Sequence, residues 1–312
     1  MKKEIIVTGG AGFIGGSLAG RLIKEGYKVI VLDNFSTGYH ENIPNEADFI
    51  YFDVSQPGYY HKIKKLKPAA VFHIAGQSSG EVSFDNPLYD FDVNARSTLM
   101  MLDYCKSNDV KRFFYASSMS VYGNKMKQVA EDEPLEPISF YGASKLASEK
   151  YMAIYSKAGI ATTAFRLFNV YGPMQNLNNM RQGMVSIYMA FMLAEKPVHV
   201  KGPLERYRDF IYIDDVINCF MECLFNKNTE NKVYNVAAGR KTTILSLLET
   251  MFEAAGEKGY PYKSEGSTPG DTFGIFAEIN KITSETNWRP QTSLGEGIKK
   301  MYEFYKKNRE KR

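Results

Sequence analysis

The chain has 312 residues and a formal net charge of +4 at pH 7, with 44% hydrophobic and 24% charged residues. This composition is ordinary for a soluble globular protein, and neither a signal peptide nor an apolar stretch of membrane-spanning length is recognisable. We therefore expect a cytoplasmic protein without a membrane partner, and the modest charge gives no reason to expect a nucleic-acid partner. Three cysteines, Cys105, Cys219 and Cys223, form no metal-ligand array, so we expect them in the core and no metal site.

The first element is a short apolar run at residues 3–8 that leads into three glycines spaced by three. Gly9, Gly12 and Gly15 let the backbone turn sharply, approach a pyrophosphate and pack the next helix closely on the strand. The N-terminus of that helix supplies N–H groups to phosphates. A strand, a tight turn and a helix in this order predict a dinucleotide site.

The second apolar run, at residues 27–32, ends in Asp33, about 20 residues past the glycines. A carboxylate at this position accepts hydrogen bonds from both hydroxyls of a ribose and repels a 2′-phosphate. Asp33 therefore favours NAD over NADP. The alternative for the glycines alone is a turn that binds no ligand.

Strands and helices alternate along the next part of the chain. We expect strands at residues 48–53, 70–74, 112–118 and 161–168. We expect helices at residues 87–107 and 139–157 and a further helix whose basic face is at residues 62–67. The alternation predicts parallel strands with crossover helices, which makes an α/β fold with a doubly wound (Rossmann) sheet.

Beyond Gly172 and Pro173 the regular alternation loosens into a polar loop, followed by helices and short strands rich in Gly and Pro. This predicts a smaller C-terminal substrate-binding lobe at the carboxyl edge of the strands, where ligands of open α/β sheets bind. We expect an NAD-binding Rossmann domain over residues 1–172, with a segment near 206–238 that returns to it. Residues 173–312 then form mainly the substrate-binding lobe.

Tyr141 and Lys145 lie four residues apart in a predicted helix, and therefore on one face of it. A cation stabilises a phenolate and an oxidised nicotinamide adds a second positive charge, so we expect Tyr141 to act as a base near neutral pH. Ser118 ends the strand at residues 112–118 and offers a hydroxyl that orients a substrate. Tyr and Lys at this spacing are also common in purely structural positions.

These residues join further motifs at residues 33–38, 73–77, 121–123 and 166–173. With them the chain resembles the extended short-chain dehydrogenase/reductase superfamily, and within it the nucleotide-sugar epimerases of UDP-glucose 4-epimerase type, nearly from end to end. The resemblance implies NAD as the cofactor and Ser118, Tyr141 and Lys145 as the catalytic residues.

The resemblance also implies which residues bind the ligands. The cofactor would contact Gly9, Gly12, Phe13, Ile14, Gly15, Asp33, Asn34, Ser36, Thr37, Gly38, Asp53, Val54, Ala75, Gly76, Gln77, Asn94, Tyr141, Lys145 and Phe168. The substrate would contact Ser78, Ser79, Ser118, Ser120, Tyr141, Asn169, Arg208 and Asp271. Arg208 resembles the arginine that binds the diphosphate in the family, and Arg206 is the alternative candidate for this contact. Asp53 as a strand end, Asn169 as a turn cap, and His73 and His199 as structural histidines are the simpler interpretations.

The departures from the family pattern narrow the chemistry. Dehydrating members carry an Asp-Glu pair, and decarboxylating members a Glu, at the positions of Met119 and Ser120. Neither residue can protonate a leaving hydroxyl, so a simple epimerase is favoured. An arginine usually stands three residues before the aspartate of the Gly270-Asp271 pair, but this chain has Thr268. Its phosphate contact is then missing or is supplied by a residue such as Arg181, Arg206 or Arg240.

We therefore expect NAD-dependent C4 epimerisation of a nucleotide-diphosphate hexose, UDP-glucose/galactose or the N-acetyl forms, through a 4-keto intermediate. Ile275 stands where a larger residue limits the substituent at C2, which leaves the N-acetyl sugars open. A reductase, dehydrogenase or dehydratase of the same superfamily is the alternative, and a non-catalytic NAD-binding regulator a more distant one. The resemblance further implies a homodimer with a four-helix interface from residues 87–107 and 139–157, whose apolar side chains equally suit contact with the sheet.

Overall fold

The computed structural model describes residues 2–267 and 271–309. Two residues of the family motif before Asp271 lie outside the described residues. They are Thr268, where the sequence departs from the motif, and Gly270, which matches it. None of the helices within these two ranges combines the length and the apolar character needed to cross a membrane.

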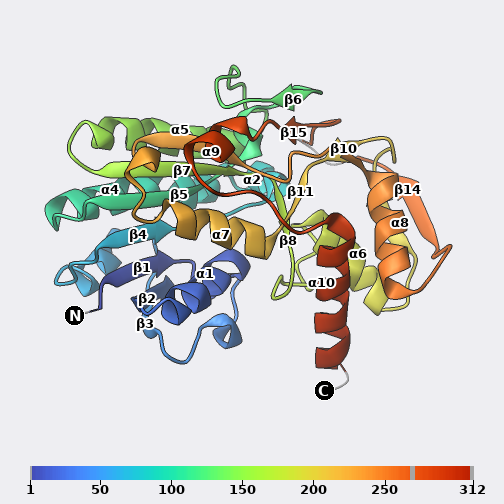
Figure 1. The fold of residues 1–312 in the computed structure, drawn as a ribbon, viewed down its shortest axis with the longest axis horizontal. Helices are drawn as coiled ribbons and strands as arrows, with labels where there is room; N and C mark the ends of the chain where they lie inside the picture. The colour runs from blue at the N-terminus through green and yellow to red at the C-terminus, as the bar shows by residue number, and fades with distance from the viewer. Residues whose placement is uncertain (1, 268–270, 310–312) are drawn as a thin grey trace.

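Seven parallel strands form the central sheet, in the order β12-β7-β5-β4-β1-β2-β3 (Figure 1). They are β1 (Glu4–Thr8), β2 (Lys28–Asp33), β3 (Asp48–Tyr51), β4 (Ala70–His73), β5 (Arg112–Ser118), β7 (Ala161–Leu167) and β12 (Lys232–Val236). The strand order runs outward from β1 to β3 and resumes on the other side of β1 with β4, which places a topological switch point between β1 and β4. The expected doubly wound α/β fold is confirmed.

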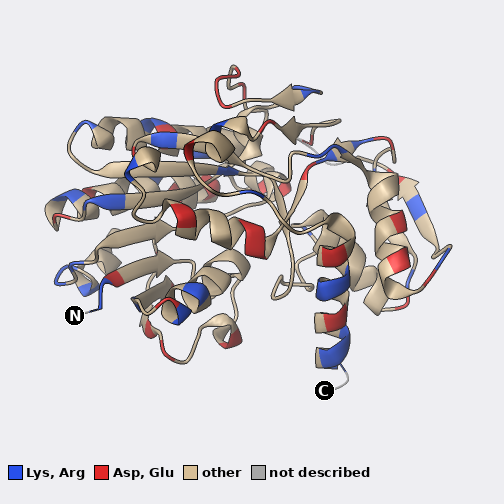
Figure 2. Ribbon diagram, viewed as in Figure 1, with Lys and Arg blue, Asp and Glu red and all other residues tan. Residues whose placement is uncertain are grey.

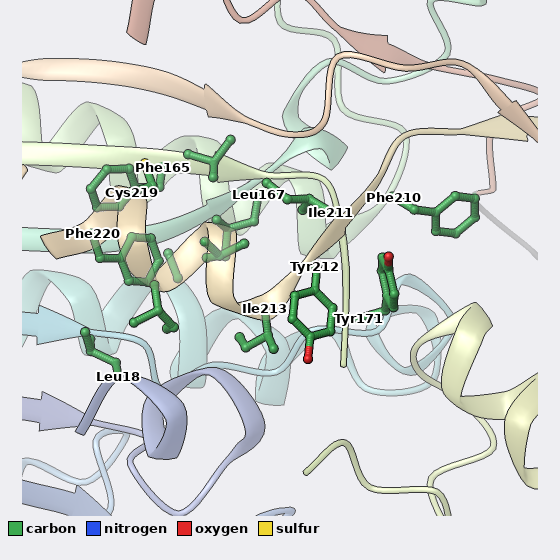
Figure 3. Packing of buried hydrophobic residues seen from close by; sticks show 14 of the residues in the cluster. Leu18, Phe165, Leu167, Tyr171, Phe210, Ile211, Tyr212, Ile213, Cys219 and Phe220 are labelled. Atoms are coloured by element: carbon green, nitrogen blue, oxygen red, sulfur yellow. The ribbon is translucent and has the colours of Figure 1, made fainter. Parts of the chain in front are cut away.

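Helices cover both faces of the sheet, as α/β folds require. One face carries α1 (Phe13–Lys24) and α7 (Ile213–Cys223), and the other carries α4 (Ser97–Ser107) and α5 (Phe140–Ser156). Side chains of a strand alternate between the faces: Ile5 packs in the first layer and Ile6 in the second. Figure 3 shows the first layer, where the rings of Phe165 and Phe220 lie 4.6 Å apart. Cys219 packs in the same layer, as expected for a core cysteine.

A second group of elements builds the lobe on the right of Figure 1. It contains α6 (Met184–Leu193), β9 (Val198–Lys201), α8 (Ile244–Ala255), β14 (Tyr262–Glu265) and α10 (Leu294–Arg309). β14 pairs with β9, and α10 packs on α8. Positive and negative residues are interspersed along α10 in Figure 2.

The remaining strands and α-helices are short. They are α2 (Gly80–Asp85), α3 (Pro87–Phe91), β6 (Gln128–Val129), β8 (Asn169–Tyr171), β10 (Tyr207–Arg208), β11 (Phe210–Tyr212), β13 (Thr242–Thr243), β15 (Phe276–Ala277) and α9 (Asn280–Glu285). β11 pairs with β8 next to the end of β7, and from there α7 and β12 return to the main sheet. The chain therefore crosses between sheet and lobe more than once.

Two predicted helices differ from the observed ones. No α-helix forms at residues 62–67, which are fully described: a 3₁₀-helix at Pro57–Lys62 is followed by turns. Pro68 disfavours a helical conformation of the residue before it, and Ile63 is the one fully buried side chain of the run, too little for an apolar stripe. The predicted helix at residues 87–107 is interrupted by a π-helical turn at Asp92–Arg96 between α3 and α4. Such turns insert one residue and often occur at functional sites.

Candidate active site

A cavity of about 580 Å³ opens at the carboxyl ends of the parallel strands. Residues after β1, β2, β4, β5 and β7 line it, and α6 with the loop before it closes the opposite side. Open α/β sheets bind ligands at this position, because the connections diverge at the switch point. The cavity is therefore the candidate active site.

This cavity brings together residues that are far apart in the sequence. Every residue predicted for the cofactor lines it except Asn94, and every residue predicted for the substrate lines it except Arg208 and Asp271. The lobe adds lining residues that were not predicted, such as Gln182 and Val185. No local motif marks these two positions, which reach the cavity because α6 and the loop before it pack across it.

Gly9 ends β1 and turns the chain toward α1. Its φ of +70° lies in the left-handed region, and a Cβ there would stand 2.7 Å from the backbone nitrogen of Ala75. α1 starts at Phe13 with Gly12 as its N-cap, and within this described turn neither a capping side chain nor an acidic residue is present. The free N–H groups and the positive end of the helix dipole therefore remain available to a pyrophosphate.

Asp33 lies at the end of β2, and its side chain is buried against the glycine turn. Its Oδ2 atom accepts a hydrogen bond from the backbone N–H of Ala11 at 3.0 Å, and its Oδ1 atom accepts one from Phe35 at 2.7 Å. Burial raises the pKa of this carboxyl, whereas the backbone N–H groups lower it. A carboxylate oxygen accepts more than one hydrogen bond, so Asp33 retains acceptor capacity for the two hydroxyls of a ribose.

Asn94 lies in the π-helical turn and packs beside Gly76, which lines the cavity. Its Nδ2 atom donates to the backbone oxygen of Gln77 at 2.9 Å and to Oδ1 of Asp90 at 3.1 Å. Its Oδ1 atom is buried without a partner among the described residues, and a Cβ on Gly76 would lie 2.7 Å from it. A buried acceptor beside a glycine suits a polar group of a bound molecule. Together with the glycine turn and Asp33, this arrangement fits NAD.

Ser118, Tyr141 and Lys145 meet at the inner end of the cavity. Tyr141 stands in the first turn of α5, which Ser139 caps by accepting the N–H of Gly142 at 3.1 Å. The Nζ atom of Lys145 lies 5.7 Å from the centre of the Tyr141 ring and donates to the backbone oxygen of Ala116 at 2.9 Å. The carboxyl end of β5 presents Ser118 to the same space.

Burial shifts the pKa values of Tyr141 and Lys145. It raises the pKa of Tyr141 to about 12, although the hydroxyl of Ser118 lowers it. Burial also lowers the pKa of Lys145 to about 8, against the carboxylate of Asp90, which raises it. The side chains of the protein thus keep Tyr141 protonated at neutral pH. The expectation that Tyr141 ionises near neutrality therefore depends on the second positive charge, that of an oxidised nicotinamide.

Two acidic residues of this region were not predicted. Asp90 in α3 accepts hydrogen bonds from Gln77 and Ser144, and Glu149 in α5 binds the guanidinium of Arg166. Both carboxylates are buried. The signal that could have found them is helical spacing, because Asp90 stands four residues before Asn94 and Glu149 four residues after Lys145.

Arg208 and Asp271 lie outside the lining of the cavity, at the junction with the lobe. Arg206 and Arg208 are both buried, and each forms an ion pair with Asp271. On α6, Val185 lines the cavity, and Tyr188 lies close enough to both arginines for their charges to lower its pKa against the effect of burial. The two arginines therefore lie near α6, which lines the cavity through Val185.

The other proposed phosphate contacts and Ile275 are placed differently. Arg181 forms ion pairs with Asp85 and Glu81 at the surface of the protein. Ile275 is buried in a small apolar cluster with Phe168 and is not among the lining residues. Phe168 lines the cavity and Ile275 packs behind it, so a role of Ile275 at the C2 substituent stays a prediction.

The chain resembles known proteins over nearly all of its length. It is 33% identical over 307 residues to a putative UDP-glucose 4-epimerase of Methanocaldococcus jannaschii, covering 97% of this chain and 99% of that protein. The structure of the UDP-glucose 4-epimerase of Thermotoga maritima with UDP-glucose superposes with a TM-score of 0.92 at 33% identity, covering 98% of this chain and 99% of that one. The UDP-glucuronic acid 4-epimerase of Bacillus cereus, solved with UDP-glucuronic acid and NAD, superposes with a TM-score of 0.89 at 28% identity, covering 98% and 99%.

A family model described as NAD dependent epimerase/dehydratase family matches residues 5–237, which include every strand of the central sheet and the three residues at the inner end of the cavity. The resemblance expected from the sequence motifs is confirmed. The chain belongs to the NAD-dependent epimerase/dehydratase family and is an enzyme that uses NAD as its cofactor.

Proposed function

We propose that this enzyme inverts the configuration at C4 of the hexose in a nucleotide-diphosphate sugar, with UDP as the nucleotide, through a 4-keto intermediate. The observation that carries the proposal is the meeting of Ser118, Tyr141 and Lys145 at the inner end of a cavity that also holds the glycine turn and Asp33. The lining positions beside Ser118 are Met119 and Ser120, so the acid that a dehydratase needs is missing there.

The side chains at the inner end would divide the work among them. Tyr141 as a phenolate removes the proton from the C4 hydroxyl, Ser118 hydrogen-bonds the same oxygen, and Lys145 stabilises the phenolate. The glycine turn and Asp33 would hold NAD, which would supply a hydride acceptor for C4 that can return the hydride to either face of the sugar ring. The enzyme then ends each turnover with its cofactor in the oxidised form.

The lining of the cavity favours an uncharged sugar. Around Ser120 and Asn169 it offers hydroxyl and amide groups, and Lys145 is the one lysine or arginine among the described lining residues. Its ammonium already binds a backbone oxygen of β5. The carboxylate of a uronic acid would lack the charged partner that such a group usually finds, whereas glucose, galactose and their N-acetyl forms suit neutral polar partners.

Arg208, Arg206 and Asp271 are our candidates for the diphosphate end of the substrate. Two buried guanidinium groups share one carboxylate, which leaves one positive charge for an anion. Arg206 would thus supply the contact that the family motif takes from an arginine at position 268. We further propose that residues 1–172 and the segment 206–238 hold NAD, and that most of residues 173–312 shape the substrate side.

The proposal is tested by incubating the purified protein with UDP-, GDP-, CDP- and dTDP-hexoses without added cofactor and separating the epimers. We expect interconversion of UDP-glucose and UDP-galactose, or of their N-acetyl forms, and little conversion of UDP-glucuronic acid. Tyr141→Phe should lower kcat by about 10²–10⁴-fold because it removes the base. Tyr155→Phe, on the same helix but outside the cavity lining, is its control.

Two outcomes would overturn the proposal. Stoichiometric accumulation of free NADH would identify a dehydrogenase that exchanges its cofactor. Full activity of Tyr141→Phe would remove the assigned base and the mechanism with it.

A further inference from the structure

Asp90 is a carboxylate with no exposed surface beside the catalytic side chains. Its Oδ1 atom accepts hydrogen bonds from Nε2 of Gln77 at 2.7 Å and from Nδ2 of Asn94 at 3.1 Å. Its Oδ2 atom accepts one from the hydroxyl of Ser144 at 2.6 Å. An ionised carboxylate only accepts hydrogen bonds, so all three donors match the charged form of Asp90.

The three donors come from three segments that surround the inner end of the cavity. Gln77 follows β4 and lines the cavity, Asn94 lies in the π-helical turn, and Ser144 stands between Tyr141 and Lys145 on α5. Asp90 therefore ties the helix that carries the catalytic side chains to the loop after β4 with a single buried group.

Lys145 is also buried, and an ammonium without a nearby anion is unfavourable in such a place. Most titratable groups around it carry no charge at neutral pH. Burial and the charge of Lys145 lower the pKa of His73 on β4 to about 3, and burial raises the pKa of Tyr115 on β5. Burial likewise raises the pKa of Tyr141 on α5.

The other buried carboxylate near α5 is already neutralised. Glu149, one turn after Lys145, accepts two hydrogen bonds from the guanidinium of Arg166, at 3.0 and 2.8 Å. Asp90 is thus the anion that raises the pKa of Lys145 against burial. Burial raises the pKa of Asp90 itself, whereas its hydrogen-bond donors and the charge of Lys145 lower it.

We propose that Asp90 is a positioning residue for the reaction at C4, whose buried negative charge keeps Lys145 protonated and whose hydrogen bond to Ser144 holds α5 against the cofactor loop. The inference rests on the proposed function for its kinetic readout. A neutral group at position 90 leaves the ammonium of Lys145 without an anion, so Lys145 loses its proton at a lower pH.

The direct test measures the titration of Lys145 by NMR in the full-length protein labelled with ¹³C at lysine Cε, with and without NAD. The signal is assigned by comparison with Lys145→Arg. In Asp90→Asn, which keeps the shape and removes the charge, we expect the pKa of Lys145 to fall by about one unit or more. Asp92→Asn is the matched control, because Asp92 lies two residues away but is half exposed and paired with Arg96.

The kinetic test follows kcat of the NAD-loaded enzyme against pH. In Asp90→Asn the alkaline limb should move to lower pH in parallel with the NMR titration, while Asp90→Glu keeps the charge and therefore keeps the limb even where kcat falls. If Asp90→Asn is not folded by circular dichroism, Asp90→Ser removes the charge with a smaller side chain. A merely structural role would lower kcat at every pH without moving the limb.

An unchanged pKa of Lys145 in the folded charge-neutral variant overturns the inference. This failure differs from a failure of the proposed function. If the wild-type protein epimerises a UDP-sugar and the titration stays unmoved, the inference alone is wrong. If the wild-type protein epimerises none, the proposed function is wrong, and the NMR measurement still decides the role of Asp90.

Discussion

His73 is a single buried polar residue that supports the cofactor site. It is fully buried at the end of β4, with Oγ1 of Thr8 2.9 Å from its Nδ1 atom and Oγ of Ser97 3.2 Å from its Nε2 atom. The hydroxyl of Ser97 donates to the backbone oxygen of Val93, so it accepts from Nε2–H, and Thr8 donates to Nδ1. Thr8 in turn accepts the N–H of Ala75 at 3.1 Å. The imidazole is thus a structural link between β1, β4 and the first residue of α4.

This environment makes a prediction about pH. The pKa of His73 falls from 6.5 to about 3 on folding, so between these values the unfolded chain binds the extra proton and His73 destabilises the fold as pH falls. When the pH is lowered from about 7 to about 5, the unfolding free energy of the wild type should fall by about 2 kcal/mol more than that of His73→Gln. Urea unfolding at the two pH values measures this. Exposed His199→Gln is the control, and an unchanged pH dependence in His73→Gln would contradict the assignment.

At the scale of elements, a buried ion pair joins α5 to the carboxyl end of β7. Glu149 on α5 binds Arg166 on β7 through two hydrogen bonds, and the hydroxyl of Ser117 on β5 donates to the same carboxylate at 2.5 Å. Ser117 directly precedes Ser118, so this contact holds the hydroxyl that we propose as catalytic against the helix that carries Tyr141. Three elements of the site share one carboxylate.

Glu149→Gln should therefore destabilise the protein strongly. The guanidinium of Arg166 would remain buried without its anion, which costs about 3–5 kcal/mol of unfolding free energy in comparable cases. Chemical denaturation monitored by circular dichroism measures the change. Glu25→Gln removes an exposed ion pair with Arg21 and should change the stability by less than about 0.5 kcal/mol. A loss of less than about 1 kcal/mol in Glu149→Gln would show that the pair contributes little.

The elements that the sequence predicted correctly are those with a local cause. The glycine turn, Asp33 and the apolar strands at 112–118 and 161–168 follow from backbone geometry and hydrophobic pattern. The π-helical turn has no such signal, because one inserted residue hardly changes a hydrophobic pattern. The pairing of β9 with β14 joins two segments about sixty residues apart, each too short to specify a partner.

The same holds for the candidate site: residues in a local motif were predictable, and contacts made by the tertiary fold were not. Tyr141 and Lys145 are recognisable because they stand four positions apart on one helix. Asp90 was missed because its role requires α3 to pack on α5, which only the folded chain shows. The ion pairs of Arg206 and Arg208 with Asp271 also depend on the tertiary fold, although all three residues stood out in the sequence.

At the scale of the whole molecule, apolar side chains remain exposed on the helices that cover one face of the sheet. Leu88 is 77% exposed, Ile154 is 64% exposed, and Phe91 and Leu99 are also exposed. A group of this kind on adjacent helices is typical of a protein interface. We propose that two copies of the chain pair through these helices, as the family resemblance implies.

Light scattering after size-exclusion chromatography tests this pairing. The wild-type protein should elute with the mass of two 35.3 kDa chains, and the double variant Leu88→Glu/Ile154→Glu should have the mass of one, because four charges in a paired interface lose their solvation. Met126→Glu, at another exposed apolar position, should remain dimeric. A monomeric wild type at micromolar concentration would contradict the proposal.

The central claim is that the hydride removed from C4 is returned to the same carbon within one turnover. It is tested most directly with UDP-glucose that carries deuterium at C4, incubated with the purified enzyme in ordinary water without added cofactor. The account predicts UDP-galactose that retains the deuterium at C4, because the sheltered cofactor does not exchange its hydride with water. Loss of the deuterium to the solvent, or its appearance in free NADH, would contradict the account.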